Sequence, residues 1–190
     1  MNALALLFGL MSLSTSGATP FSVPEGYELQ VLEPTGGKIA RPAGWFYRER
    51  HGRSFTWIIS KEDPNNGPYE TGIRIQVFAG VKEHTGKTAE VFVRDFFAQK
   101  KSSASVLSEC EPQKQYLFTR VCLETEEFIS LSGPPELFHI QYSMFWGDGS
   151  DIAVITTAGS PASSWPTYEK TFNTMGKFEL IDMSRFAKGP

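Results

Sequence analysis

The feature that most constrains the fold is a single change of hydrophobic period in a chain whose other segments have the pattern of strands. From Thr71 to Phe78 (TGIRIQVF) apolar and polar residues alternate, which is typical of a β-strand with one buried face. From Thr88 to Lys101 the apolar residues instead recur every three or four positions. This spacing predicts an amphipathic helix that begins after Thr88.

Strand-type runs flank that helix on both sides. Six further strands are expected, at residues 27–32, 45–50, 55–60, 116–125, 138–146 and 152–158. A second helix is expected from Ser163 onward, with Pro166 tolerated in its first turn. The order of strands, helix, strands and helix predicts an α+β fold, in which an antiparallel sheet of about six to seven strands is packed by two main helices. We expect one such domain over residues 19–190.

The first 18 residues carry no charged side chain, and Ala3 to Leu13 is an apolar run. This run is shorter than the ~20 residues that a membrane-spanning helix needs. Small residues follow at Ser16, Gly17 and Ala18, which is typical of a signal peptide cleaved after Ala18. We therefore expect export to the periplasm or the outside of the cell, with no stable membrane anchor after cleavage. Because the run lacks a preceding Lys or Arg, a buried N-terminal helix or strand is the alternative.

The chain has two cysteines, Cys110 and Cys122. An even count in an exported protein predicts one disulfide between them, and two unrelated buried thiols are the alternative. Two cysteines are too few for a zinc site on their own, and none of the three histidines lies at ligand spacing from them.

Three parts of the chain together resemble a known fold family. They are Pro42, Gly44 and Trp45 at the entry to an early strand, the Phe-rich helix in the middle, and the closing helix SWPTYEKTFNTMGKFEL. Over residues 25–182 or so, this arrangement resembles the PsbP-like α/β/α sandwich, which includes DcrB-like periplasmic proteins and a Ran-binding nuclear import factor. The resemblance implies a mostly non-enzymatic protein that binds a partner.

The stretch RPAGWFYRERHG interleaves cations with aromatic side chains. Alternation along the strand places Trp45 and Tyr47 toward the core, and it leaves Arg48, Arg50 and Arg53 as a basic rim around a hairpin. With a net charge of −3, the chain lacks the basic balance typical of nucleic-acid binders, so no nucleic-acid partner is expected. The stretch is interpreted as a structural hairpin with an exposed basic rim, and a docking site for an acidic protein partner at Arg48, Arg50 and Arg53 is the functional alternative.

Catalytic and metal-binding patterns are few. The sequence has no G-x-S-x-G, and His139 is the histidine of most interest because it shares a strand face with Gln141 and Ser143. It is a candidate general base, or part of a solvated strand face. Candidate calcium ligands are Asp63 in one turn and Asp148 and Asp151 in another, although turns favour Asp for local backbone bonding as well. We expect no metal and no cofactor.

These features favour an exported binding or accessory protein without catalysis, which engages a protein partner through a sheet face or the basic rim. A sharper version is a periplasmic immunity protein that neutralises a delivered toxin. A second alternative is a hydrolase or ligand-binding enzyme with a cleft near His139, and a third is a calcium-dependent structural module.

Overall fold

The computed structural model describes residues 21–115, 117–182 and 185. The expected signal peptide, residues 1–18, lies outside this range. Within the described range, no helix combines the length and the apolar character that crossing a membrane requires.

The described chain folds into ten strands and three helices. The strands are β1 (Tyr27–Leu32), β2 (Gly36–Pro42), β3 (Phe46–His51), β4 (Phe55–Ser60), β5 (Gly72–Ala79), β6 (Ser105–Gln115), β7 (Phe118–Ile129), β8 (Glu136–Gly147), β9 (Ile152–Pro161) and β10 (Glu179–Ile181). The helices are α1 (Val81–Thr85), α2 (Ala89–Ser103) and α3 (Trp165–Met175).

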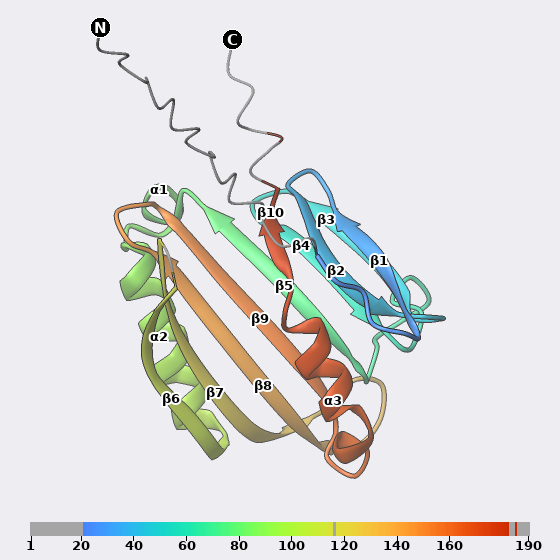
Figure 1. Cartoon of the computed structure of the whole chain (residues 1–190). Helices are drawn as coiled ribbons and strands as arrows, with labels where there is room; N and C mark the ends of the chain where they lie inside the picture. The colour runs from blue at the N-terminus through green and yellow to red at the C-terminus, as the bar shows by residue number, and fades with distance from the viewer. Residues whose placement is uncertain (1–20, 116, 183–184, 186–190) are drawn as a thin grey trace, which may run out of the picture.

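The strands form two antiparallel sheets. The larger has seven strands in the order β3-β4-β5-β9-β8-β7-β6, and the smaller has three in the order β1-β2-β10. Helix α2 packs on one face of the large sheet, over β7, β8 and β9, and we call this the α2 face. Helix α3 and the small sheet lie on the opposite face, which we call the α3 face (Figure 1).

Each face of the large sheet has its own apolar core. On the α3 face, Trp57 and Ile75 of the sheet pack with Phe172 of α3, and the Trp57 indole donates a hydrogen bond of 2.8 Å to the Glu33 carbonyl. On the α2 face, Met144 is fully buried in a cluster that includes Val93 of α2. The large sheet is therefore held between two layers.

A half-buried carboxylate links α2 to the sheet. Glu127 accepts hydrogen bonds from Lys100 (2.8 Å), from the Tyr142 hydroxyl (2.7 Å) and from the Thr125 hydroxyl (3.0 Å). Burial by itself would raise the pKa of Glu127, but the bonds from Lys100 and Tyr142 outweigh it and lower the pKa. Burial and the Glu127 charge both raise the pKa of Tyr142, so this hydroxyl stays protonated and donates. Glu127 is thus part of the packing between α2 and β7.

The α+β prediction is confirmed, and every expected strand and helix is present with shifts of a few residues at the ends. The structure adds α1, β2, β6 and β10, and it divides the strands into two sheets. Strand β2 contains Gly36, Gly37 and Pro42, which have the pattern of a turn in the sequence. Gly37 is needed there because a Cβ atom would lie 2.4 Å from the Glu179 carbonyl oxygen of β10. Strand β6 lacks alternation because nearly all of its residues are exposed.

Candidate functional site

The most open functional surface is the α3 face of β6, β7 and β8. On this face α3 contacts β9 and β5 and its Trp165 stacks on His139 of β8, while no described helix lies across β6 (Figure 1). The register of β7 with β8 and of β8 with β9 places polar side chains together on this face. They are Arg120 and Glu124 of β7, His139, Gln141 and Ser143 of β8, and Thr156 of β9.

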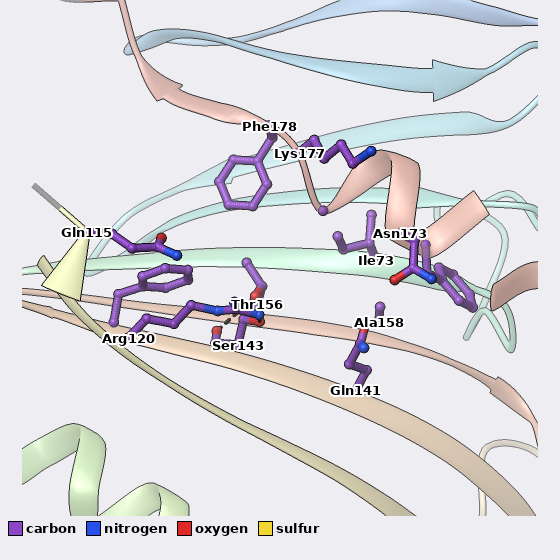
Figure 2. A pocket seen from close by; sticks show the side chains of 13 residues that line it. Ile73, Gln115, Arg120, Gln141, Ser143, Thr156, Ala158, Asn173, Lys177 and Phe178 are labelled. Carbon is purple, nitrogen blue, oxygen red and sulfur yellow. Dashed lines mark hydrogen bonds between the residues drawn. The ribbon is translucent and has the colours of Figure 1, made fainter. Parts of the chain in front are cut away.

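A cavity of about 210 Å³ lies where this face meets α3. Its floor includes buried Thr156 and Ala158 of β9, and its rim includes exposed Asn173 of α3 and exposed Lys177 in the turn after that helix (Figure 2). Gln115 closes the side toward β6. The remaining lining consists of Ile73, Arg120, Gln141, Ser143, Phe145, Phe172, Gly176 and Phe178.

Arg120 dominates the chemistry of this cavity. Its Nη2 donates to the Ser143 hydroxyl at 2.9 Å, while its Nε is buried and has no hydrogen-bond partner in the described part of the chain (Figure 2). The neighbouring Thr156 hydroxyl donates to the Ser143 carbonyl at 2.8 Å, which ties β9 to β8 beside this site. Lys177 adds a second positive charge, and none of the described lining residues is acidic. Such a group of donors suits a carboxylate, because a guanidinium presents paired N–H groups to two oxygens.

His139 lies farther along the same face. Its Nε2 is 2.6 Å from Glu124 Oε1, and its ring stacks on Trp165 of α3 with centroids 3.9 Å apart. With a side-chain exposure of 13%, it is not on a solvated strand face. Ser108 donates to the other oxygen of Glu124 at 2.8 Å, so the carboxylate lies between the hydroxyl and the imidazole. Activation of a serine nucleophile needs the imidazole in the middle, and this geometry does not provide that order.

The predicted basic rim lies elsewhere. Arg48 and Arg50 point to the α2 face of β3, and Arg53 lies in the turn before β4. The Arg48 guanidinium donates to the Pro64 carbonyl, so it holds the loop between β4 and β5. These three residues are on strand β3 and its turn, at the opposite edge of the large sheet from β6, and they do not meet the Arg120 cavity.

The two cysteines face each other across the edge of the large sheet. Cys110 of β6 and Cys122 of β7 are paired in register, with Cα atoms 5.2 Å apart and sulfur atoms within bonding distance. The pair ties the edge strand β6 to β7 next to the Arg120 cavity. A disulfide-bonded pair is compatible with an exported protein.

The three candidate calcium ligands are engaged by the chain itself. Asp63 accepts from the Asn65 and Asn66 side chains at 2.9 and 2.8 Å. Asp148 pairs with Lys114 at 2.9 Å, and this hydrogen bond is the main reason why the pKa of Asp148 is lowered.

Asp151 accepts from the Lys82 amide at 2.9 Å, at the start of α1. Across the described residues, no group of three or more His, Cys, Asp or Glu side chains is arranged to hold a metal ion. The structure thus gives each of the three aspartates a local structural partner.

Sequence reasoning did not single out Arg120, Asn173 or Lys177. Arg120 lies in a run that was expected to be a strand, and its alternation with buried Thr119 and Val121 places it on the polar face. This alternation indicates only that Arg120 lies on the polar face of a strand. The sequence does not show that the end of α3 lies over Arg120 and closes a cavity there.

Among known proteins, solved structures are similar to this chain, and the similarity is one of fold. No protein-family model matches it, and no curated protein matches it. Similar solved structures include the cyanobacterial PsbP (CyanoP) of Synechocystis, with 12% identity over 87% of this chain and 99% of that chain, at a TM-score of 0.49. The chain resembles PsbP-like proteins in fold.

Two further structures extend this comparison. The Ran-binding protein Mog1p of Saccharomyces cerevisiae has 12% identity over 83% of this chain and 97% of that chain, at a TM-score of 0.46. A Bacteroides thetaiotaomicron protein has 15% identity over 80% of this chain and 47% of that chain, at a TM-score of 0.44. These likenesses concern the fold, and the function is argued from the site.

Proposed function

We propose that this chain is an exported binding or accessory protein without catalysis, which engages a protein partner through the α3 face of β6, β7 and β8. The observation that carries the proposal is the Arg120 cavity. It holds a guanidinium whose buried Nε lacks a partner among the described residues, in a lining whose described members include no acid. The signal-like start of the sequence and the cysteine pair support export.

The partner presents an acidic segment to this face. One carboxylate of the segment enters the cavity and accepts hydrogen bonds from Arg120, which is held in place by its bond to the Ser143 hydroxyl. Lys177 at the rim adds attraction that weakens as salt increases. The polar side chains of Gln141 and Asn173 flank the carboxylate and supply further hydrogen bonds.

Site-specific photo-cross-linking in the native envelope tests this proposal. A cross-linker at Gln141 reports on the α3 face, and one at Gln76, which lies on the α2 face of β5, serves as the control position. We expect a partner that is captured from Gln141 and not from Gln76. Capture should fall by about tenfold in Arg120→Gln, because a charge-assisted hydrogen bond is lost.

The basic rim provides the matched comparison. Changing Arg48, Arg50 and Arg53 to Glu reverses its charge without touching the Arg120 cavity. Capture that survives this triple change and is lost in Arg120→Gln supports the sheet face. Capture that survives Arg120→Gln and is lost in the triple change refutes the sheet face and favours the rim.

Two of the three sequence alternatives, the immunity protein and the hydrolase, remain separate predictions. An immunity protein would use the same α3 face to bind a toxin, and the captured partner would then be that toxin. A hydrolase near His139 would show turnover that disappears in His139→Ala, and its activity would contradict the binding proposal.

A further inference from the structure

A second cavity, of about 270 Å³, lies on the α2 face of the large sheet. It is formed by the loop before β5, the end of β7 and the facing parts of β8 and β9. Its lining residues are Pro68, Tyr69, Glu70, Gly72, Arg74, Ile129, Leu131, Phe138, Ile140, Thr157 and Gly159. Unlike the Arg120 cavity, it is walled mainly by apolar side chains.

Arg74 is the unusual residue of this cavity. It lies on β5 with Thr157 of β9 directly opposite, and both side chains belong to the α2 face. The Nε of Arg74 and the hydroxyl of Thr157 are buried, and neither has a hydrogen-bond partner in the described part of the chain. A buried donor that is left unpaired costs free energy, and a guanidinium keeps its charge at any physiological pH. The two groups therefore present unused polar atoms at one end of an apolar cavity.

The neighbours of Arg74 do not neutralise it. Burial raises the pKa of Tyr69, and the charge of Arg74 offsets this only in part, so the Tyr69 phenol is neutral. Glu70 also lines the cavity, but it forms no ion pair with Arg74. Glu70 is exposed, and its backbone amide donates a hydrogen bond of 3.1 Å to the Glu62 carboxylate. The cavity thus combines the Arg74 cation and the Glu70 carboxylate, which form no ion pair with each other, with mainly apolar walls.

The apolar walls continue beyond Arg74. Ile129, Leu131 and Phe138 line this cavity and also an adjacent hollow of about 400 Å³ beneath the turn between β7 and β8, which Glu70 and Glu136 line as well. Leu131 is 38% exposed, so the apolar lining reaches the surface at the mouth of the site. An apolar path that begins at a cation and ends at the surface fits a molecule with an anionic head and an apolar chain.

We propose that this cavity binds a small amphiphile with a carboxylate head and a short apolar chain. The carboxylate accepts hydrogen bonds from the Arg74 guanidinium and the Thr157 hydroxyl, and the chain lies along Ile129, Leu131 and Phe138 toward the surface. A carboxylate matches the donors present, since one guanidinium fork pairs with two oxygens. The site is on the opposite face of the sheet from the Arg120 cavity, so it is independent of the proposed partner-binding function.

Backbone amide NMR of the full chain, titrated with octanoate, tests the proposal. We expect saturable shifts at Gly72, Arg74 and Gly159, which line the cavity. Two comparison compounds separate the parts of the ligand: acetate has the head without the chain, and 1-octanol has the chain without the charge. Each should bind at least about tenfold more weakly than octanoate, since each lacks one of the two interactions.

Variants locate the site. Arg74→Gln should weaken octanoate binding about tenfold or more, while Arg50→Gln, which removes a charge from the same face of β3, and Arg120→Gln should leave it unchanged. Thr157→Val keeps the shape of the side chain and removes the hydroxyl, so it tests the site should Arg74→Gln fail to fold. Octanoate binding by folded Arg74→Gln or Thr157→Val that equals the wild type, equal binding of 1-octanol, shifts centred on Ser143, or no shifts at millimolar octanoate would each overturn the proposal.

Discussion

Removing the Glu127 carboxylate is the perturbation whose effect the structure defines most closely. Glu127 accepts hydrogen bonds from Lys100, Tyr142 and Thr125. Tyr142 is 2% exposed and Thr125 is 0% exposed. In Glu127→Ala both buried hydroxyls lose their acceptor, which costs about 1–3 kcal/mol each. The half-buried pair with Lys100 adds less than about 1 kcal/mol. We therefore expect the free energy of unfolding to fall by about 2–7 kcal/mol.

Glu127→Gln separates the charge from the hydrogen bonds. Its amide oxygen can still accept from Tyr142 and Thr125, so it should lose only about 1–2 kcal/mol. Glu90→Ala is the matched control on α2, because it breaks an exposed pair with Arg94 and should cost less than about 0.5 kcal/mol. Urea unfolding followed by circular dichroism measures all three.

The pH dependence gives a second test. Because the folded protein lowers the pKa of Glu127 from its ordinary value of 4.5, its charge contributes stability that is present above about pH 4.5. That contribution is lost as the pH falls through the folded pKa. The stability difference between the wild type and Glu127→Gln should therefore be constant near pH 7 and shrink in acid. A Glu127→Ala variant no less stable than Glu90→Ala, or a difference that grows in acid, would refute the reasoning.

Three further predictions concern the disulfide, the core of the α2 face and the start of α1. Replacing Cys110 and Cys122 together with Ser should lower the free energy of unfolding by about 3 kcal/mol, measured by urea unfolding under non-reducing conditions, and reductant should then have no further effect. Met144→Ala should cost about 2–5 kcal/mol in the same assay because the side chain is fully buried, and a loss below 1 kcal/mol would contradict its place in the core. Asp151→Ala should cost about 1 kcal/mol and speed hydrogen exchange at the Lys82 amide, whereas unchanged exchange would mean that the bond does not hold α1.

Much of the fold was predictable because the spacing of apolar residues along the chain follows the geometry of each strand and helix. The alternation in β5 and β8 and the three- and four-residue spacing in α2 reflect which side chains are buried, and burial repeats with the geometry of each element. The sequence did not predict β6 and β2, because their residue patterns do not reflect burial on one face. Strand β6 is an exposed edge with irregular pairing to β7, and in β2 the close backbone of β10 requires a glycine at Gly37.

The candidate sites were predictable only in part. The sequence placed His139, Gln141 and Ser143 on one strand face, and the register confirms it. It also suggested that Arg48, Arg50 and Arg53 form a docking rim, which stays a prediction. Arg120 and Arg74 were not recognised as site residues, because a cation on a strand is common and its lack of a partner depends on distant segments.

The sequence by itself determined the fold class and the polar and apolar sides of the main strands, and it predicted the cysteine pair, because these depend on residue type and on spacing along the chain. The tertiary structure decided which polar side chains lie beneath another element. The end of α3 lies over Arg120, and the loop before β5 lies beside Arg74. A pocket is a property of segments that are far apart in the sequence. Its unpaired charges become visible only when the packing that isolates them from water and from counter-charges is known.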